Sequence, residues 1–100
     1  MATATRTLEQ PLRLIFFHSR LSGQCRRVEG FLAQVLQRRR NHATFNVVQV
    51  AEEERPDLLE RFKVETVPTL VVVEGTAVAG RLESPRGCRE IEGFLSRWLH

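Results

Sequence analysis

The residues best suited to chemistry in this 100-residue chain are a serine and a cysteine three positions apart, in Ser22-Gly23-Gln24-Cys25. They follow an apolar run and open a segment with helical periodicity, which places both at the start of a helix. Cys25 can act as a nucleophile, but a cysteine in such a position also serves as a small buried apolar side chain. Ser22 is explained equally well as the N-cap of the helix.

Two further side chains have reactive chemistry. Cys88 is expected in the first turn of the last helix, either as a partly packed side chain or, if exposed, as a reactive thiol. A disulfide between Cys25 and Cys88 stays open as an alternative. His18 ends an apolar run, where it could shuttle a proton or simply lie on the surface rim. Because His18 and Cys25 have no third ligand nearby, we expect no metal and no cofactor.

A second motif, Thr66-Val67-Pro68-Thr69, precedes the β-branched run Leu70–Val73. Proline lacks an N–H, so Pro68 cannot lie inside a central strand but can begin one. The Val67–Pro68 bond is a candidate for the cis form, which would leave the backbone before the proline facing outward. This motif therefore predicts a bent loop with backbone groups available to a partner.

These motifs must be positioned by seven elements in the order β-α-β-α-β-β-α. Apolar runs predict strands, and apolar residues spaced i, i+3, i+4 predict helices. The first two strands are joined by a helix and should be parallel, whereas the last two form an antiparallel hairpin. The predicted elements are strands at 12–18, 45–50, 68–73 and 77–82, and helices at 23–40, at 57–62 with Pro56 at its first position, and from Ser84-Pro85 onward with Ser84 as its cap.

Composition places the chain among ordinary soluble single domains, with 42% hydrophobic and 27% charged residues. We predict a polar lead-in, disordered or extended, at residues 1–11, followed by one domain at 12–100. No apolar segment is long enough for a membrane span or a secretory signal, so two free thiols in the cytoplasm are expected. The net charge of +3 comes without a basic stripe interleaved with aromatics, so nucleic acid is not expected as a partner.

The order of elements, the Ser-X-X-Cys turn and the Thr-Val-Pro-Thr segment together resemble the thioredoxin family. The resemblance covers roughly residues 12–99. It implies an α/β, minimal thioredoxin-like fold: a mixed four-stranded sheet flanked by helices, without the leading strand and helix of longer thioredoxins. In that family a Cys-X-X-Cys motif exchanges disulfides, and the loop with the cis proline binds an extended peptide or a thiol compound.

The resemblance also exposes where this chain departs from the redox pattern. Ser22 occupies the position of the attacking cysteine and Cys25 that of the resolving cysteine. A serine hydroxyl does not attack disulfides at neutral pH, so the two-thiol cycle is not expected. Other family positions differ as well: Phe16 matches the buried Asp, Gln49 the Lys that faces it, and Leu21 and His18 the two Trp residues near the first cysteine.

Two functional hypotheses follow. The first is a thioredoxin-like protein with residual monothiol chemistry at Cys25, so that enzymatic activity stays an open question. The second is a non-catalytic module, or adaptor, that binds a protein or peptide in the groove next to Pro68. The resemblance assigns substrate binding to Gly23, Gln24, Thr66, Val67, Pro68 and Thr69.

Overall fold

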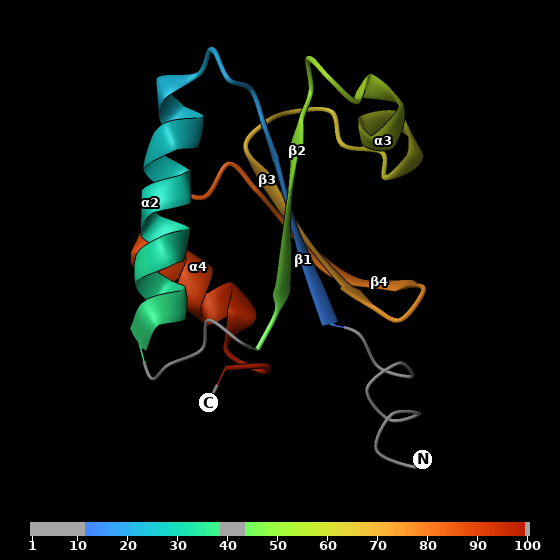
Figure 1. Cartoon of the computed structure of the whole chain (residues 1–100). Coiled ribbons are helices and arrows are strands. Elements are labelled where there is room, and N and C mark those ends of the chain that lie inside the picture. The colour runs from blue at the N-terminus through green and yellow to red at the C-terminus, as the bar shows by residue number, and fades with distance from the viewer. Residues whose placement is uncertain (1–11, 39–43, 100) are drawn as a thin grey trace.

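A computed structural model describes residues 12–38 and 44–99. The predicted lead-in at 1–11 and the predicted end of the first helix at 39–40 lie outside the described residues. Figure 1 shows a twisted sheet with helices on both faces. The elements are β1 (Leu12–His18), α2 (Gly23–Gln37), β2 (Asn46–Ala51), α3 (Pro56–Arg61), β3 (Thr69–Glu74), β4 (Ala77–Glu83) and α4 (Cys88–Leu95).

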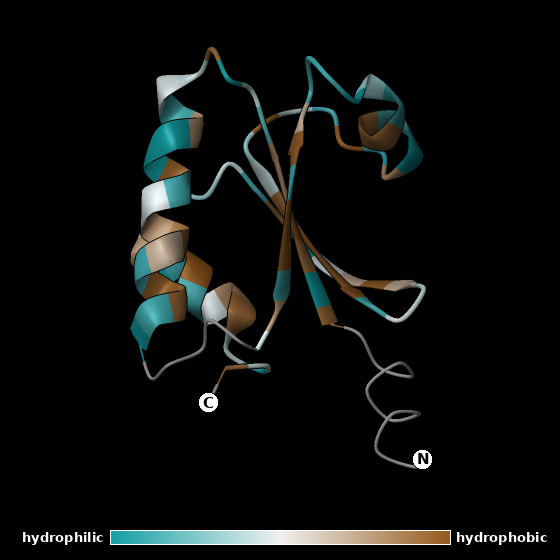
Figure 2. Ribbon diagram, viewed as in Figure 1, coloured by the Kyte–Doolittle hydropathy of each residue, from teal (hydrophilic) through white to brown (hydrophobic). Residues whose placement is uncertain are grey.

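The sheet has the order β2-β1-β3-β4. β1 pairs in parallel with β2 and antiparallel with β3, and β3 pairs antiparallel with β4. The predicted α/β fold, its element order and its mixed four-stranded sheet are therefore confirmed. The alternation of side chains along the two central strands, which are coloured hydrophobic in Figure 2, builds a separate apolar cluster on each face.

One face of the sheet is covered by α2 and α4, and the other by α3. The first cluster joins Leu14 and Phe16 of β1 to Leu32 of α2 and Ile91 of α4. The second joins Ile15 and Phe17 to α3, whose Leu58, Leu59 and Phe62 are only partly buried. Trp98 packs edge-on against Phe45 and Phe94 at the margin of the first cluster, as expected for a packing residue.

Two predictions about burial and boundaries need correction. The second strand was expected at 45–50 and buried, but β2 is Asn46–Ala51 and only its last two residues are buried. The reason is its position at the edge of the sheet, which leaves one side of the strand without a neighbour. Phe45 is buried just ahead of the strand.

The last helix also begins later than predicted. It starts at Cys88, and its N-cap is Gly87 rather than Ser84. Ser84 has φ of 47°, which is incompatible with the extended conformation of an N-cap. Its N–H instead donates to the carbonyl of Pro68 at 2.8 Å. The second helix, α3, begins at Pro56 as predicted but ends at Arg61, with Phe62 as its C-cap.

The packing of α4 on the sheet predicts a large effect of truncation at Ile91, which is fully buried in the first cluster. Ile91→Ala should lower the free energy of unfolding by about 2–5 kcal/mol, because a cavity replaces the lost methyl groups. Arg89→Ala, at an exposed position of the same helix, is the control and should change little. Urea denaturation measures both, and equal effects of the two variants would contradict this packing.

Candidate functional site

Ser22 is the N-cap of α2. Its backbone is extended, with φ of −102° and ψ of 119°, and its side-chain oxygen accepts a hydrogen bond from the Cys25 N–H at 3.2 Å. The capping role predicted as one alternative is thus what the structure shows. Gly23 and Gln24 form the exposed first turn of the helix. The Ser22 hydroxyl therefore satisfies a helix terminus.

Cys25 points into the protein, with only 2% of its surface exposed. Its sulfur accepts a hydrogen bond from the Ser19 N–H at 3.3 Å and packs in the cluster with Phe16 and Val28. These surroundings agree with the prediction that Cys25 serves as a small buried apolar side chain. A small cavity borders the thiol.

That cavity has a volume of about 220 Å³ and lies at the end of β1, against the first turns of α2. The ring of His18 stacks on the ring of Phe16, with centroids 5.1 Å apart, so His18 borders the cavity instead of extending into solvent. The residues that line it are Phe16, His18, Ser19, Arg20, Cys25, Arg26 and Glu29. The side chain of Gln49 in β2 donates a hydrogen bond to the carboxylate of Glu29 in α2 at 3.0 Å.

Hydrogen bonds to Glu53 connect the turn before α2 with the segment that follows β2. The Ser19 hydroxyl donates to one oxygen of the Glu53 carboxylate, and the Arg20 N–H donates to the other at 3.2 Å. The hydrogen bond from Ser19 holds the pKa of the Glu53 carboxyl below its usual value of 4.5. Beside it, Arg20 forms an ion pair with Glu54 at 2.7 Å. Glu52, Glu53 and Glu54 are all exposed, so these contacts lie at the surface, just ahead of α3.

The loop before β3 has the predicted bend. The Val67–Pro68 bond is cis, and Pro68 is buried. The Thr69 hydroxyl donates to the carbonyl of Thr66 at 2.7 Å, which closes the turn. Within residues 12–38 and 44–99, neither the N–H nor the carbonyl of Val67 has a hydrogen-bond partner.

The loop and the serine-cysteine turn lie at the same end of the sheet. Thr69 pairs with Phe17 of β1, one residue before His18, where β1 leads into the turn. The Val67 side chain packs against the cluster that contains Cys25. In Figure 1 the start of β3 and the start of α2 both lie toward the upper end of the sheet. The unpaired backbone of Val67 is thus near the capped end of α2.

Cys88 belongs to neither segment. Its thiol donates to the Gln34 side-chain oxygen at 3.1 Å and contacts the carbonyl of Phe31 at 3.7 Å, both in the second half of α2. Cys25 and Cys88 are both free thiols, so the alternative of a disulfide is not realised.

The model of the family described as thioredoxin matches residues 4–97, nearly the whole chain. The chain belongs to the thioredoxin family. Among solved structures, desulfothioredoxin from Desulfovibrio vulgaris Hildenborough is similar, with 25% identity, a TM-score of 0.74 and coverage of 92% of this chain and 86% of that one.

Two more distant structures share the thioredoxin fold with this chain. Trxlp from Edwardsiella tarda has 18% identity and a TM-score of 0.77, with coverage of 94% of this chain and 91% of that one. The germline-specific thioredoxin Deadhead from Drosophila melanogaster has 17% identity and a TM-score of 0.75, with coverage of 98% and 90%. The comparison with curated proteins finds no match.

Sequence reasoning missed Ser19 and Glu53 as parts of this end of the sheet. The predicted parallel pairing of the first two strands could have indicated this contact, because parallel neighbouring strands have their carboxyl ends at the same edge of the sheet. His18 pairs with Ala51, so the residues that follow each strand must meet. In the part of the chain that the structure describes, no three His, Cys, Asp or Glu side chains gather to hold a metal ion. No helix among those residues has the length and apolar character needed to cross a membrane.

The cap predicts how Ser22 responds to substitution. Ser22→Ala should lower the free energy of unfolding by about 1 kcal/mol, because the Cys25 N–H loses its acceptor. Ser22→Thr keeps a hydroxyl in place and should lose much less. Chemical denaturation compares the two, and equal losses would show that the hydroxyl is not acting as a cap.

The Glu53 contacts predict a pH dependence. A lowered pKa in the folded state means that charged Glu53 adds stability above pH 4.5, and that this contribution disappears as the pH falls through the lower folded value. Glu53→Gln should therefore reduce the Tm at pH 7, and its difference from the wild type should shrink in acid. Thermal unfolding over a pH series measures this. Glu52→Gln, at a position without a side-chain hydrogen bond in the described chain, should show no such trend.

Proposed function

We propose that this protein is a binding module of the thioredoxin family that holds an extended peptide of a partner protein against the loop 66–69, without dithiol-disulfide exchange. The observation that carries the proposal is the unpaired backbone of Val67 beside a helix start whose serine is a cap. The partner is defined here by its chemistry, as a peptide strand with free backbone N–H and carbonyl groups.

Dithiol exchange needs two thiols within reach of each other. The structure offers one, Cys25, in the first turn of α2, while the Cys88 thiol is hydrogen-bonded to Gln34 near the other end of that helix. The Ser22 hydroxyl is engaged with the Cys25 N–H. A disulfide bound at this surface would therefore find no attacking sulfur at position 22 and a buried one at position 25.

Peptide binding needs only backbone groups in the right place. An extended peptide that donates one N–H to the Val67 carbonyl and accepts one hydrogen bond from the Val67 N–H would add a short strand, as in β-augmentation. Pro68 has no N–H and its carbonyl accepts from the Ser84 N–H, so pairing would not extend from Val67 into Pro68. Exposed Gly23 and Gln24 at the start of α2 would form the opposite side of the binding site.

A second candidate function is monothiol chemistry, which the cavity next to Cys25 favours. Cys25 Sγ would attack one sulfur of a small disulfide such as oxidised glutathione. A new S–S bond would form to Cys25 as the old one breaks, and the released thiolate would take up a proton. The 2% exposure of Cys25 makes this the weaker candidate.

Phage display of linear random peptides against the intact protein, followed by titration of the selected peptides, tests the binding function. N-methylation at one backbone position should weaken binding about tenfold or more, because it removes the donor to Val67 without changing a side chain. N-methylation at the adjacent residue, which faces away, is the matched control. Failure to enrich any peptide, or equal effects at every position, would contradict the proposal.

Insulin reduction with dithiothreitol separates the two candidates. Binding without thiol chemistry predicts that turbidity develops no faster with the protein than without it, and that Cys25→Ser retains peptide affinity within about twofold. Turnover that is lost in Cys25→Ala would establish the monothiol function instead.

A further inference from the structure

The two faces of the sheet are covered unequally. α2 has fifteen residues and shares its face with α4, whereas α3 has six residues and is the only described helix on the other face. In Figure 1 α3 lies at one end of the sheet, beside the ends of β1 and β2. A groove of about 610 Å³ runs from α3 toward the turn between β3 and β4.

The floor of this groove is apolar. It is formed by side chains from all four strands, including Ile15 and Phe17 of β1, Val48 of β2 and Val73 of β3. Val78 of β4 lies at its edge with 49% of its surface exposed, although it is a large apolar side chain. An apolar sheet face is normally covered by a helix. The groove therefore exposes the kind of apolar surface against which a helix packs.

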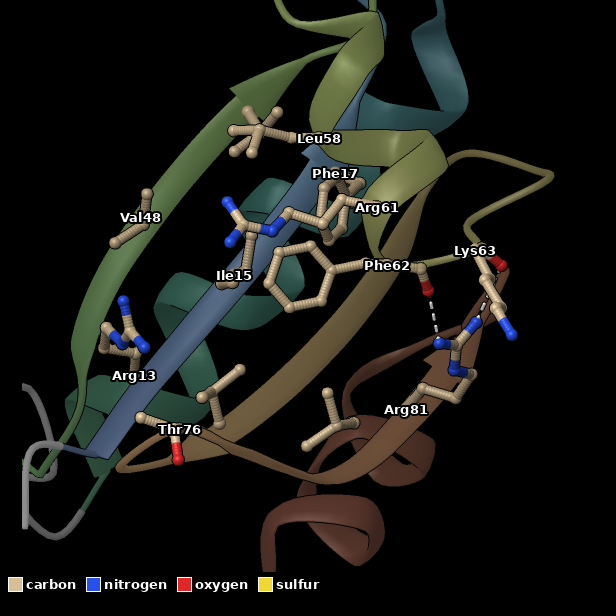
Figure 3. A pocket seen from close by; sticks show the side chains of 13 residues that line it. Arg13, Ile15, Phe17, Val48, Leu58, Arg61, Phe62, Lys63, Thr76 and Arg81 are labelled. Carbon is tan, nitrogen blue, oxygen red and sulfur yellow. Dashed lines mark hydrogen bonds between the residues drawn. The ribbon is translucent and has the colours of Figure 1, made fainter.

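The charged side chains that line the groove are all basic. They are Arg13, Arg61, Lys63 and Arg81, and Figure 3 shows them around the apolar floor. In the described part of the chain none of the four forms an ion pair with a carboxylate. Arg13 donates to the carbonyl of Gly75 at 3.0 Å, and Arg81 donates to the carbonyls of Phe62 and Lys63. These bonds fix two guanidinium groups at the rim without neutralising them.

We propose that this groove binds an acidic amphipathic helix of a partner protein. The apolar face of such a helix would cover the valines and Ile15, and acidic side chains flanking that face would meet the four cations. The chain itself supplies no equivalent segment: residues 1–11 contain one arginine and one glutamate, and a second copy carries a net charge of +3 and the same basic rim. The site is independent of the loop 66–69 and of Cys25, which packs on the other face of the sheet.

A designed probe tests the proposal on the full chain. The probe is a fluorescein-labelled peptide of about 18 residues, made of leucine, alanine and glutamate, with leucines at helical i, i+3, i+4, i+7 spacing and glutamates on both sides of them. A peptide of the same pattern with lysine in place of glutamate is the control. Fluorescence anisotropy should show saturable binding of the acidic peptide only, weakening as salt is added.

Matched variants locate the site. Arg61→Glu should weaken binding about fivefold or more, and Arg61→Gln less, whereas Arg89→Glu on α4 makes the same charge change on the other face and should have no effect. Val78→Thr should weaken binding, whereas Val47→Thr, at an exposed valine on the other face of β2, should not. Amide chemical shifts in β1, β4 and α3 should move on binding while those of α2 stay in place.

Several results overturn the proposal. These are absence of binding at protein concentrations up to roughly 1 mM, equal weakening by Arg61→Glu and Arg89→Glu, or shifts centred on α2. A wild-type dimer that Val78→Thr dissociates would mean that a second copy covers the groove. Binding that strengthens about tenfold when residues 1–11 are deleted would mean that the chain's own segment covers it.

Discussion

Strand β1 is hydrogen-bonded on both sides, in parallel to β2 and antiparallel to β3, and its side chains supply both apolar clusters. This pairing determines which loop segments lie next to one another at the end of the sheet. The parallel partner brings the acidic segment after β2 beside the turn after β1, and the antiparallel partner brings the loop before β3 to the same edge. Ser19, Glu53 and Val67 are neighbours of this edge because β1 cannot shift register without exposing its buried residues.

The side chains at this edge differ from the redox pattern that the resemblance implies. Ser22 satisfies the start of α2, and Cys25 is enclosed beneath it. Phe16 stands where the resemblance places a buried acid and stacks on His18. The backbone bend at Val67–Pro68 is retained. The function proposed here depends on backbone groups, whereas disulfide exchange depends on side chains that substitution can change one by one.

The sequence was sufficient for the order of elements, since Leu14–Phe17 and Leu70–Val73 are apolar in the pattern of central strands. It was insufficient for Ser84 and for Glu53. Ser84 was expected as a cap by residue type, yet its positive φ and its bond to Pro68 depend on a tertiary contact. Glu53 is an exposed residue of an acidic run, and its sequence neighbours indicate no partner for it. Only the register of β1 and β2 places its carboxylate at the Ser19 hydroxyl.

Two surfaces of different character are present: a backbone edge near Cys25 and a basic-rimmed apolar groove beside α3. Of the two, the edge is central to the function proposed. Hydrogen-deuterium exchange of the Val67 amide tests it most directly, with the Leu70 amide inside β3 as the protected reference. The account predicts that Val67 exchanges freely in the unbound protein and becomes protected when a selected extended peptide saturates the site. A Val67 amide already as protected as Leu70 without peptide, or one that stays unprotected when peptide is bound, would contradict it.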